Sequence, residues 1–333
     1  MIKKTTSAIV LGAVAALSGT TAMADGHAIT VGYFLEWPMP FQFAKVNGTY
    51  EEALGMEINW VSFDTGTAMS AAMASGDVQL SVSQGVPPFV VATSAGQDLQ
   101  MLDVAVSYAD NDNCVVRSDL EIDADSAADL AGSKVAVPLG TAAHYGFLRQ
   151  MDHFGVDLAS LEIVDMAPPD SAAAIAQGSI DMMCGWGGSL RRALEHGNTL
   201  LTGDEKTELG ILVFDVTSGP TDWVAENEET VAKFLAVTAE ANAMWNEGSM
   251  KDEMLPVIAQ DAGMDLEATE QTLATFVFPS VEEQLGDAWL GAAAPSFLSG
   301  VADVFVESGS IEGALDSYEG NINTGPLASA ADM

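Results

Sequence analysis

From residue 29 onward the chain alternates between two hydrophobic patterns, one typical of strands and one typical of helices. Apolar runs over residues 29–33, 56–63 and 78–82 predict three strands. Helical spacing over residues 41–53 and 67–74 predicts the two helices between them. This β-α-β-α-β order favours an α/β fold with mostly parallel sheets and flanking helices.

The alternation continues further along the chain. Residues 134–137 and 162–164 predict two more short strands, each followed by a helical stretch. Beyond residue 228 the pattern is mainly helical, most clearly over residues 231–245. The small, polar segment 321–333 predicts a loosely ordered tail at the C-terminus.

One segment recurs 102 residues later in the sequence. Residues 68–79 and 170–181 each combine an Ala-rich helix, a glycine at its end and a strand. At the same offset, Gln84-Gly85 corresponds to Trp186-Gly187. Two copies of one unit predict two lobes whose equivalent strand-end loops line a cleft, because ligands sit at the carboxyl ends of parallel strands. Alternatively, the likeness is only that of two Ala-rich helices ended by glycine, which many α/β proteins contain.

The N-terminal residues 1–24 have the pattern of a secretory signal peptide. Lys3 and Lys4 precede a short apolar run over 9–17, and Ala22-Met23-Ala24 fits a cleavage site that leaves Asp25 first. The run is shorter than the roughly 20 residues that span a membrane. We therefore expect a soluble protein exported to the periplasm; the alternative is a segment retained as an N-terminal anchor.

The balance of charge excludes several classes of partner. Acidic residues number 48 and basic residues 11, a formal net charge of −37. A chain this acidic is repelled by nucleic acid and by anionic membrane surfaces. The acidic chain would also repel a doubly charged anion such as phosphate, so a zwitterion or a cation is the more favourable ligand. We expect a monomer.

The two cysteines are too few for a disulfide scaffold. Cys114 and Cys184 each lie in a predicted strand, and an exported protein meets an oxidising compartment. They form a disulfide if those strands are neighbours, and otherwise they are two buried thiols packed as small hydrophobic groups.

Motifs spread over residues 29–320 resemble those of periplasmic taurine-binding proteins of ABC importers. That family lies within a larger group that binds sulfonates, nitrate and thiamine precursors. The matching segments include Ser75-Gly76-Asp77-Val78-Gln79, residues 134–138 with His144-Tyr145, and Phe214-Asp215-Val216. Two loops depart from the family pattern: Gln84-Gly85-Val86-Pro87 replaces a Gly-Ser-Ser, and Trp186-Gly187-Gly188 replaces a Trp-Ala-Pro.

The resemblance implies a two-lobed periplasmic binding protein fold of type II, with the solute trapped in a cleft between α/β lobes. It places residues 25–108 and 217–333 in the first lobe and 109–216 in the second. It also implies taurine or a similar small sulfonate as ligand, an inner-membrane ABC permease as partner, and no cofactor.

Taurine needs donors for its sulfonate and acceptors for its ammonium. Thr141 is expected to cap a helix that begins near Ala142, whose free N–H groups suit a sulfonate. Asp215 ends an apolar strand, where an acid is costly to bury unless it is paired or faces a cavity. Trp37 and Trp186 lie in strand-end loops, where an indole face attracts cations. The complete set of candidate ligand residues is Glu36, Trp37, Asp64, Thr65, Gln84, Tyr108, Thr141, His144, Tyr145, Trp186 and Asp215.

Each candidate also has a purely structural explanation. Thr65 is a helix cap, His144 lies on a helix surface, the tryptophans pack in the core, and Asp215 caps a turn. Sequence motifs give no support to an enzyme, because the Walker phosphate loop, the GxSxG elbow and the HExxH zinc motif are missing. The four histidines lack metal-ligand spacing. The alternatives are a binding protein for a quaternary ammonium or other zwitterionic solute, and a periplasmic enzyme of the same fold.

Overall fold

The structure is a computed structural model, and it describes residues 28–211 and 213–333. The predicted signal peptide therefore lies outside the described residues. Within them, no helix combines the length and the apolar character that crossing a bilayer requires.

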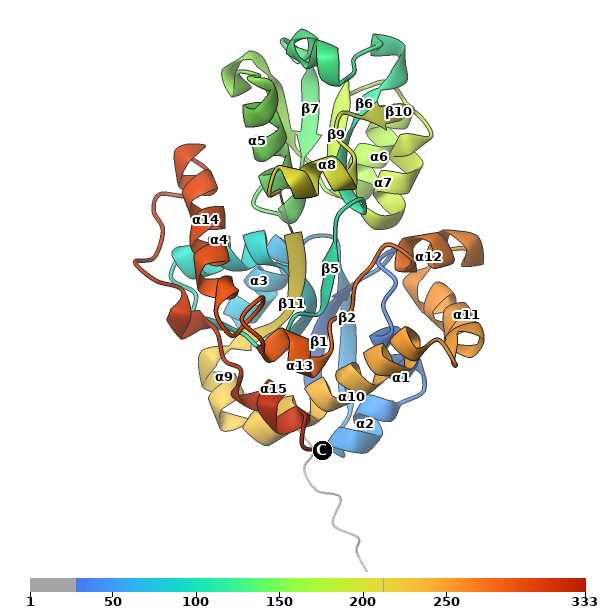
Figure 1. Cartoon of the computed structure of the whole chain (residues 1–333), viewed down its shortest axis with the longest axis vertical. Coiled ribbons are helices and arrows are strands. Elements are labelled where there is room, and N and C mark those ends of the chain that lie inside the picture. Colours follow the sequence, from blue (N-terminus) through green and yellow to red (C-terminus); the bar gives the residue numbers. More distant parts are fainter. Residues whose placement is uncertain (1–27, 212) are drawn as a thin grey trace, which may run out of the picture.

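Two β-sheets form the centres of two lobes (Figure 1). The first sheet has the order β2-β1-β3-β11-β4, with β5 paired to β11, and the second has the order β10-β6-β9-β7-β8. The first contains β1 (Ile29–Phe34), β2 (Ile58–Phe63), β3 (Leu80–Gly85), β4 (Leu99–Met101), β5 (Val106–Tyr108) and β11 (Val213–Pro220). The second contains β6 (Asp112–Arg117), β7 (Lys134–Val137), β8 (Glu162–Asp165), β9 (Met182–Trp186) and β10 (Gly197–Thr199).

Helices cover both faces of each sheet. We call each sheet with its helices the first and the second lobe. The first lobe carries α1 (Phe41–Val46), α2 (Thr49–Leu54), α3 (Gly66–Ser75), α4 (Val86–Ser94), α9 (Thr221–Glu226), α10 (Glu228–Glu247), α11 (Lys251–Ala262), α12 (Leu266–Leu273), α13 (Val281–Leu285), α14 (Ala293–Glu307) and α15 (Gly325–Ala330). The second carries α5 (Ala142–Phe154), α6 (Pro168–Ala176), α7 (Gly187–Leu194) and α8 (Gly203–Glu208). Short 3₁₀ turns span Ser118–Leu120, Ala124–Leu130, Leu158–Ser160 and Glu319–Asn321.

The internal repeat is confirmed by the topology. Strand β3, preceded by α3, and strand β9, preceded by α6, occupy the same third position in sheets of the same order. In both lobes parallel pairs join the β-α-β units. Strands β11 and β6 run antiparallel to their neighbours, because the chain reaches each of them from the other lobe. The sheets are therefore mixed, each with one strand that runs opposite to the others.

The predicted elements agree with the structure except in the helix over 41–53 and in the C-terminal tail. The expected helix over 41–53 is split at Asn47-Gly48, where Gly48 has a left-handed φ of 71°. The chain passes to the second lobe after Tyr108 and is back in the first sheet by Val213.

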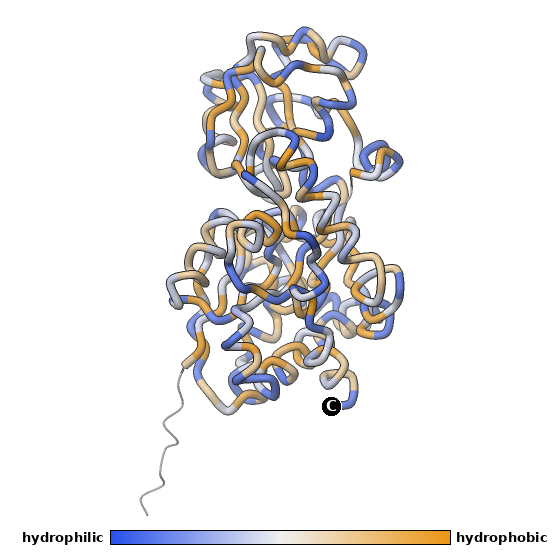
Figure 2. Tube along the Cα trace, turned by 90° about the vertical axis from the view of Figure 1, so that its left-hand side faces the viewer, coloured by the Kyte–Doolittle hydropathy of each residue, from blue (hydrophilic) through white to orange (hydrophobic). Residues whose placement is uncertain are grey.

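The expectation of a loose C-terminal tail is wrong. Asn323 N–H donates to the Met101 carbonyl at 2.9 Å, and α15 packs on α10 with Leu327 only 1% exposed. The tail thereby ends on the first lobe, at the end of the molecule away from the second lobe (Figure 2). The small residues that suggested disorder instead allow close packing against α10.

We predict that Leu327→Ala lowers the free energy of unfolding by about 2–5 kcal/mol, because it leaves a cavity in this contact. Urea denaturation measures the change. Ser329→Ala, on the exposed side of the same helix, serves as the control and should stay within about 0.5 kcal/mol of the wild type. A Leu327→Ala variant as stable as this control would contradict the packing of α15.

Candidate functional site

A small cavity lies between the two lobes at the carboxyl ends of their strands. Its free volume is only about 20 Å³, far below the roughly 300–1,000 Å³ of ligand pockets. Residues of both lobes line it: Phe34, Trp37, Gly66, Gly85, Pro88, Tyr108 and Asp215 from the first, and Thr141, Ala142 and Trp186 from the second. None of these residues is basic, although one is a carboxylate.

Four aromatic rings form most of the wall. Trp37 and Tyr108 meet edge to face, with ring centroids 4.8 Å apart at 83°. Phe34 at the end of β1 and Trp186 at the end of β9 lie 6.0 Å apart and close the cavity between the lobes. Trp37 and Trp186 were predicted as ligand residues because they lie in strand-end loops. Phe34 was not predicted, because it ends an apolar run and its sequence position is typical of a core residue.

Asp215 is the buried acid of the cavity, with 2% of its surface exposed. Ser83 Oγ donates to its Oδ2, and the Tyr108 hydroxyl donates to its Oδ1, both at 2.6 Å. Trp37 Nε1 in turn donates to Ser83 Oγ at 2.9 Å. Burial raises the pKa of Asp215 to about 7, although the two hydrogen bonds oppose the rise.

Ser83 gave no signal in the sequence. It lies in the buried strand β3 with a left-handed φ of 62°, which is uncommon for a residue other than glycine. In this conformation the Ser83 hydroxyl accepts a hydrogen bond from Trp37 and donates one to Asp215.

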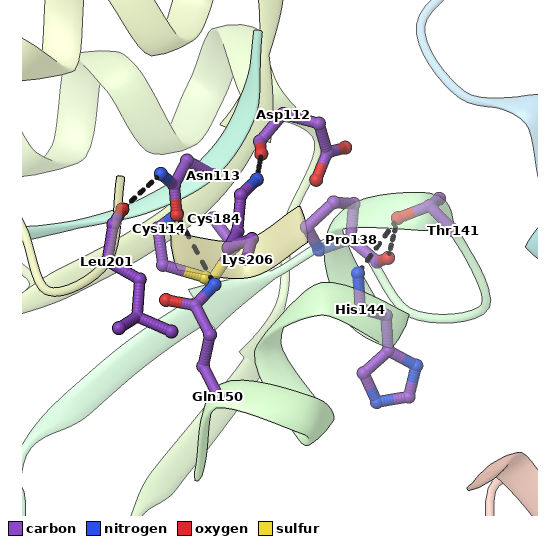
Figure 3. Close-up of a disulfide and its surroundings, with 10 residues drawn as sticks. All are labelled: Asp112, Asn113, Cys114, Pro138, Thr141, His144, Gln150, Cys184, Leu201 and Lys206. Atoms are coloured by element: carbon purple, nitrogen blue, oxygen red, sulfur yellow. Dashed lines mark hydrogen bonds between the residues drawn. A yellow bond between two sulfur atoms is a disulfide. The ribbon is translucent and has the colours of Figure 1, made fainter. Parts of the chain in front are cut away.

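The sequence also gave no indication that a second acid, Asp112, is buried near the site. It is 2% exposed, pairs with Trp186 across the β6–β9 ladder, and its Oδ2 has no partner among the described residues. Burial raises its pKa to about 7, and the charge of Lys206 opposes this. Lys206 Nζ donates to the carbonyls of Asp112 and Ala109, next to the Cys114–Cys184 disulfide (Figure 3). In the sequence Asp112 reads as part of a polar loop, Asp110-Asn111-Asp112.

Two helix N-termini also line the cavity. Gly66 begins α3 and Ala142 begins α5, and the first N–H groups of a helix have no partner inside the helix. Thr141 caps α5 as expected, accepting from His144 N–H at 3.4 Å and donating to the Pro138 carbonyl at 2.6 Å. These groups provide a positive potential without a cationic side chain.

Three predicted ligand residues of the first lobe do not line the cavity. Gln84 is buried behind the cavity, where its Nε2 donates to Ser70 Oγ at 2.6 Å and its Oε1 accepts from Ser218 Oγ. Thr65 caps α3 by accepting from Ala68 N–H at 3.2 Å. Asp64 is exposed and lines an outer pocket, on the far side of Phe34 and Trp186.

Two others lie in the contact between the lobes. His144 stacks on Phe305 of α14, with centroids 5.4 Å apart, and its Nδ1 accepts from Gly140 N–H at 3.0 Å. Burial lowers the pKa of His144 to about 4, so its ring is neutral at pH 7. Tyr145 meets the same phenyl ring edge-on, and its hydroxyl accepts from Arg149 at 2.9 Å.

The eleventh candidate, Glu36, does not line the cavity. Its carboxylate accepts from Arg192 of α7 and lines the outer pocket with it. Among the eleven, the structure thus brings together Trp37, Tyr108, Thr141, Trp186 and Asp215 around one cavity.

The disulfide joins the two strands at the base of the second lobe. Cys114 and Cys184 face each other in the antiparallel β6–β9 ladder and are bonded. No group of three or more His, Cys, Asp or Glu side chains in the described part of the chain is arranged to hold a metal ion.

Comparison with known proteins places the chain in a family. The profile of the family described as NMT1/THI5 like matches residues 39–247. The chain belongs to the NMT1/THI5-like family. Its fold is the two-lobed fold of periplasmic binding proteins, which the solved relatives share.

Several of the relatives are named as taurine- or sulfonate-binding proteins. The taurine-binding periplasmic protein of Escherichia coli is 28% identical over 66% of this chain and 67% of its own length. The periplasmic aliphatic sulphonate binding protein SsuA of E. coli has a TM-score of 0.67 at 22% identity, over 87% of this chain and 95% of that one. The alkanesulfonate-binding protein SsuA of Xanthomonas axonopodis pv. citri, bound to MOPS, has a TM-score of 0.70 at 20% identity, over 86% and 95%.

The raised pKa of Asp215 predicts how stability depends on pH. Between its ordinary value of 3.8 and about 7, the folded state holds a proton that the unfolded state has released. This residue therefore lowers the stability of the ligand-free protein as pH rises through that range. Asp215→Asn should be about 1–3 kcal/mol more stable than wild type at pH 8, with the gain vanishing near pH 4.

Urea denaturation across this pH range measures the difference between the two proteins. Asp303→Asn, which removes an exposed acid of α14, is the control and should show no gap that depends on pH. An Asp215→Asn variant that is less stable than wild type at every pH would contradict an uncompensated buried charge.

Proposed function

We propose that this protein is the solute-binding component of an ABC importer and that its solute is a small sulfonate carrying an ammonium group, with taurine the leading candidate. The protein would be exported through the signal peptide at residues 1–24, work in the periplasm as a monomer, and deliver the solute to an inner-membrane permease. Its part is binding rather than catalysis, in line with the names of its curated relatives.

The observation that best supports this proposal is that a buried carboxylate and two helix N-termini line the same cavity, without any basic side chain. Asp215 supplies a carboxylate for an ammonium, and the N-termini of α3 and α5 supply donors for a sulfonate. A sulfonate without an ammonium would share the cavity with a buried acid and no compensating cation, which is unfavourable. A zwitterion satisfies both groups.

The aromatic wall favours a second candidate, a zwitterion with a quaternary ammonium. Tryptophan faces attract cations by about 0.5–2 kcal/mol, and Trp37 and Trp186 both line the cavity. Asp215 has lone pairs that can accept hydrogen bonds from the N–H groups of a primary ammonium. A quaternary ammonium has no N–H and cannot make these bonds. Because the acid is present beside the rings, we favour the primary ammonium.

We predict that Asp215→Asn weakens taurine binding at least tenfold. Truncating one partner of a buried charge pair typically costs about 2–5 kcal/mol, and about 1.4 kcal/mol is one decade in affinity. Ethanesulfonate has no ammonium, so its affinity should fall much less or rise. Calorimetric titration of both ligands into wild type, Asp215→Asn and the Asp303→Asn control gives the comparison. Equal losses for the two ligands would assign Asp215 to the support of the fold.

Taurine affinity should also depend on pH through the same carboxyl group. An ammonium binds the ionised form of Asp215, whose pKa is about 7 in the ligand-free protein, so binding weakens as pH falls from 8 to 6. The loss approaches about tenfold per pH unit below the pKa. Ethanesulfonate should show the opposite trend, since protonation removes the repelling charge. Taurine affinity that is independent of pH in wild type would contradict an ammonium on this acid.

A further inference from the structure

Glu36 makes a polar contact between the two lobes, outside the cavity. This residue follows β1 in the first lobe, where its N–H donates to the Ala262 carbonyl of α11 at 2.7 Å. Its own carbonyl accepts from the N–H of Gly188, at the start of α7 in the second lobe, at 3.2 Å. The backbone of Glu36 is thus held by both lobes at once.

Its side chain makes a two-pronged contact with the second lobe. Arg192 Nη1 donates to Oε1 at 2.5 Å, and Nη2 donates to Oε2 at 3.0 Å. Ser189 Oγ donates to Oε2 at 3.3 Å and accepts from Arg192 Nη2 at 3.1 Å. A guanidinium bound in this bidentate way fixes the orientation as well as the distance between its partners.

The approach is so close that only glycine fits on the second lobe. A Cβ at Gly187 would lie 2.3 Å from the Glu36 carbonyl oxygen, and one at Gly188 would lie 2.9 Å from Glu36 Cβ. Gly187 also has a left-handed φ of 55°. This requirement explains a Gly-Gly pair after Trp186 in the sequence.

Glu36 itself has a left-handed φ of 54°, which is uncommon for a side chain of its kind. Such a conformation persists where surrounding contacts fix it. Here the fixing contacts come from the second lobe as well as the first, so they exist together only when the lobes are closed.

The contact is placed to hold the wall of the cavity shut. Glu36 is two residues from Phe34, and Gly187 follows Trp186, the two rings that close the cavity. Phe34 and Trp186 line the cavity on one side and the outer pocket, with Glu36 and Arg192, on the other. Separating Glu36 from α7 therefore separates these rings and opens a path to solvent.

We propose that Glu36, Gly188, Ser189 and Arg192 form an interlobe latch that sets how long the solute stays bound. Glu36 and Arg192 are positioning residues in this arrangement, since they do not line the cavity. The proposal rests on the proposed function only in that a small solute occupies the cavity; it does not depend on which solute that is.

Stopped-flow displacement of taurine, followed by tryptophan fluorescence, tests the latch. Arg192→Gln should raise the dissociation rate constant about three- to tenfold and leave the association rate constant within about twofold, as expected for a partly exposed ion pair with bidentate geometry. The increase should shrink at high salt, because salt weakens the pair in wild type. Gly188→Ala should raise the same constant without any change of charge.

The control has to come from outside the lobe contact, because Arg191 beside Arg192 also bonds the first lobe through Gln271 of α12. Lys233→Gln removes a positive charge from an exposed pair within α10 and should not alter the dissociation rate. The exchanged pair Glu36→Arg with Arg192→Glu should recover part of the lost residence time. Dissociation rates equal to wild type in both Arg192→Gln and Gly188→Ala would overturn the latch.

A second measurement separates failure of the latch from failure of the proposed function. Small-angle scattering of the ligand-free protein should give a larger radius of gyration for Arg192→Gln than for wild type, because the latch favours closed lobes without any solute. If taurine does not bind wild type, a larger radius still supports the latch. An unchanged radius in that case would overturn it.

Discussion

The burial of Asp215 is the interaction around which the site is organised. Three neighbouring strands contribute to it: β11 carries the acid, β3 carries Ser83, and β5 carries Tyr108. Placing a carboxylate in such a position costs several kcal/mol unless partners offset the lost hydration. The two hydroxyl donors offset part of that cost, and the pKa of about 7 shows that part remains. A cationic group in the cavity would compensate for the rest.

The position of the cavity follows from the duplicated topology. Each lobe has the same strand order, with a strand that arrives from the other lobe inserted next to the third strand. The two crossings turn the carboxyl ends of both sets of strands toward each other. Helix N-termini, which follow those ends, therefore converge on the space between the lobes from both sides. Gly187 permits the close approach to Glu36 that this convergence requires.

The net charge of the protein acts on a ligand at long range, whereas the potential inside the cavity acts on it once it is bound. A surface with a formal charge of −37 repels anions at long range, and the cavity offers no basic side chain to compensate. A zwitterion has no net charge, so the long-range repulsion falls on it least. Once it is inside, oriented N–H groups can hold a spread negative charge as effectively as a cationic side chain, without adding a further buried charge.

Glu36 and Asp112 illustrate how tertiary structure assigns roles that sequence leaves equal. Both are acids next to the end of a strand, Glu36 after one and Asp112 at the start of another. Long-range packing puts Glu36 on an arginine 156 positions away, outside the cavity, and buries Asp112 beside Trp186 in the β6–β9 ladder. The sequence contains no local signal for either outcome, because the partners come from elements that meet only in the folded chain.

The sequence by itself determined the alternation of strands and helices, the repeat, the cap at Thr141 and the presence of an acid in an apolar strand. These features depend on interactions within a few residues, or on a burial cost that any fold must meet. Only the tertiary structure decided that Gln84 and His144 face away from the cavity, that Ser83 joins Trp37 to Asp215, and that residues 325–330 form a packed helix. In each case the deciding contact is made by a residue far along the chain, so the direction of the side chain was fixed by packing rather than by its neighbours in sequence.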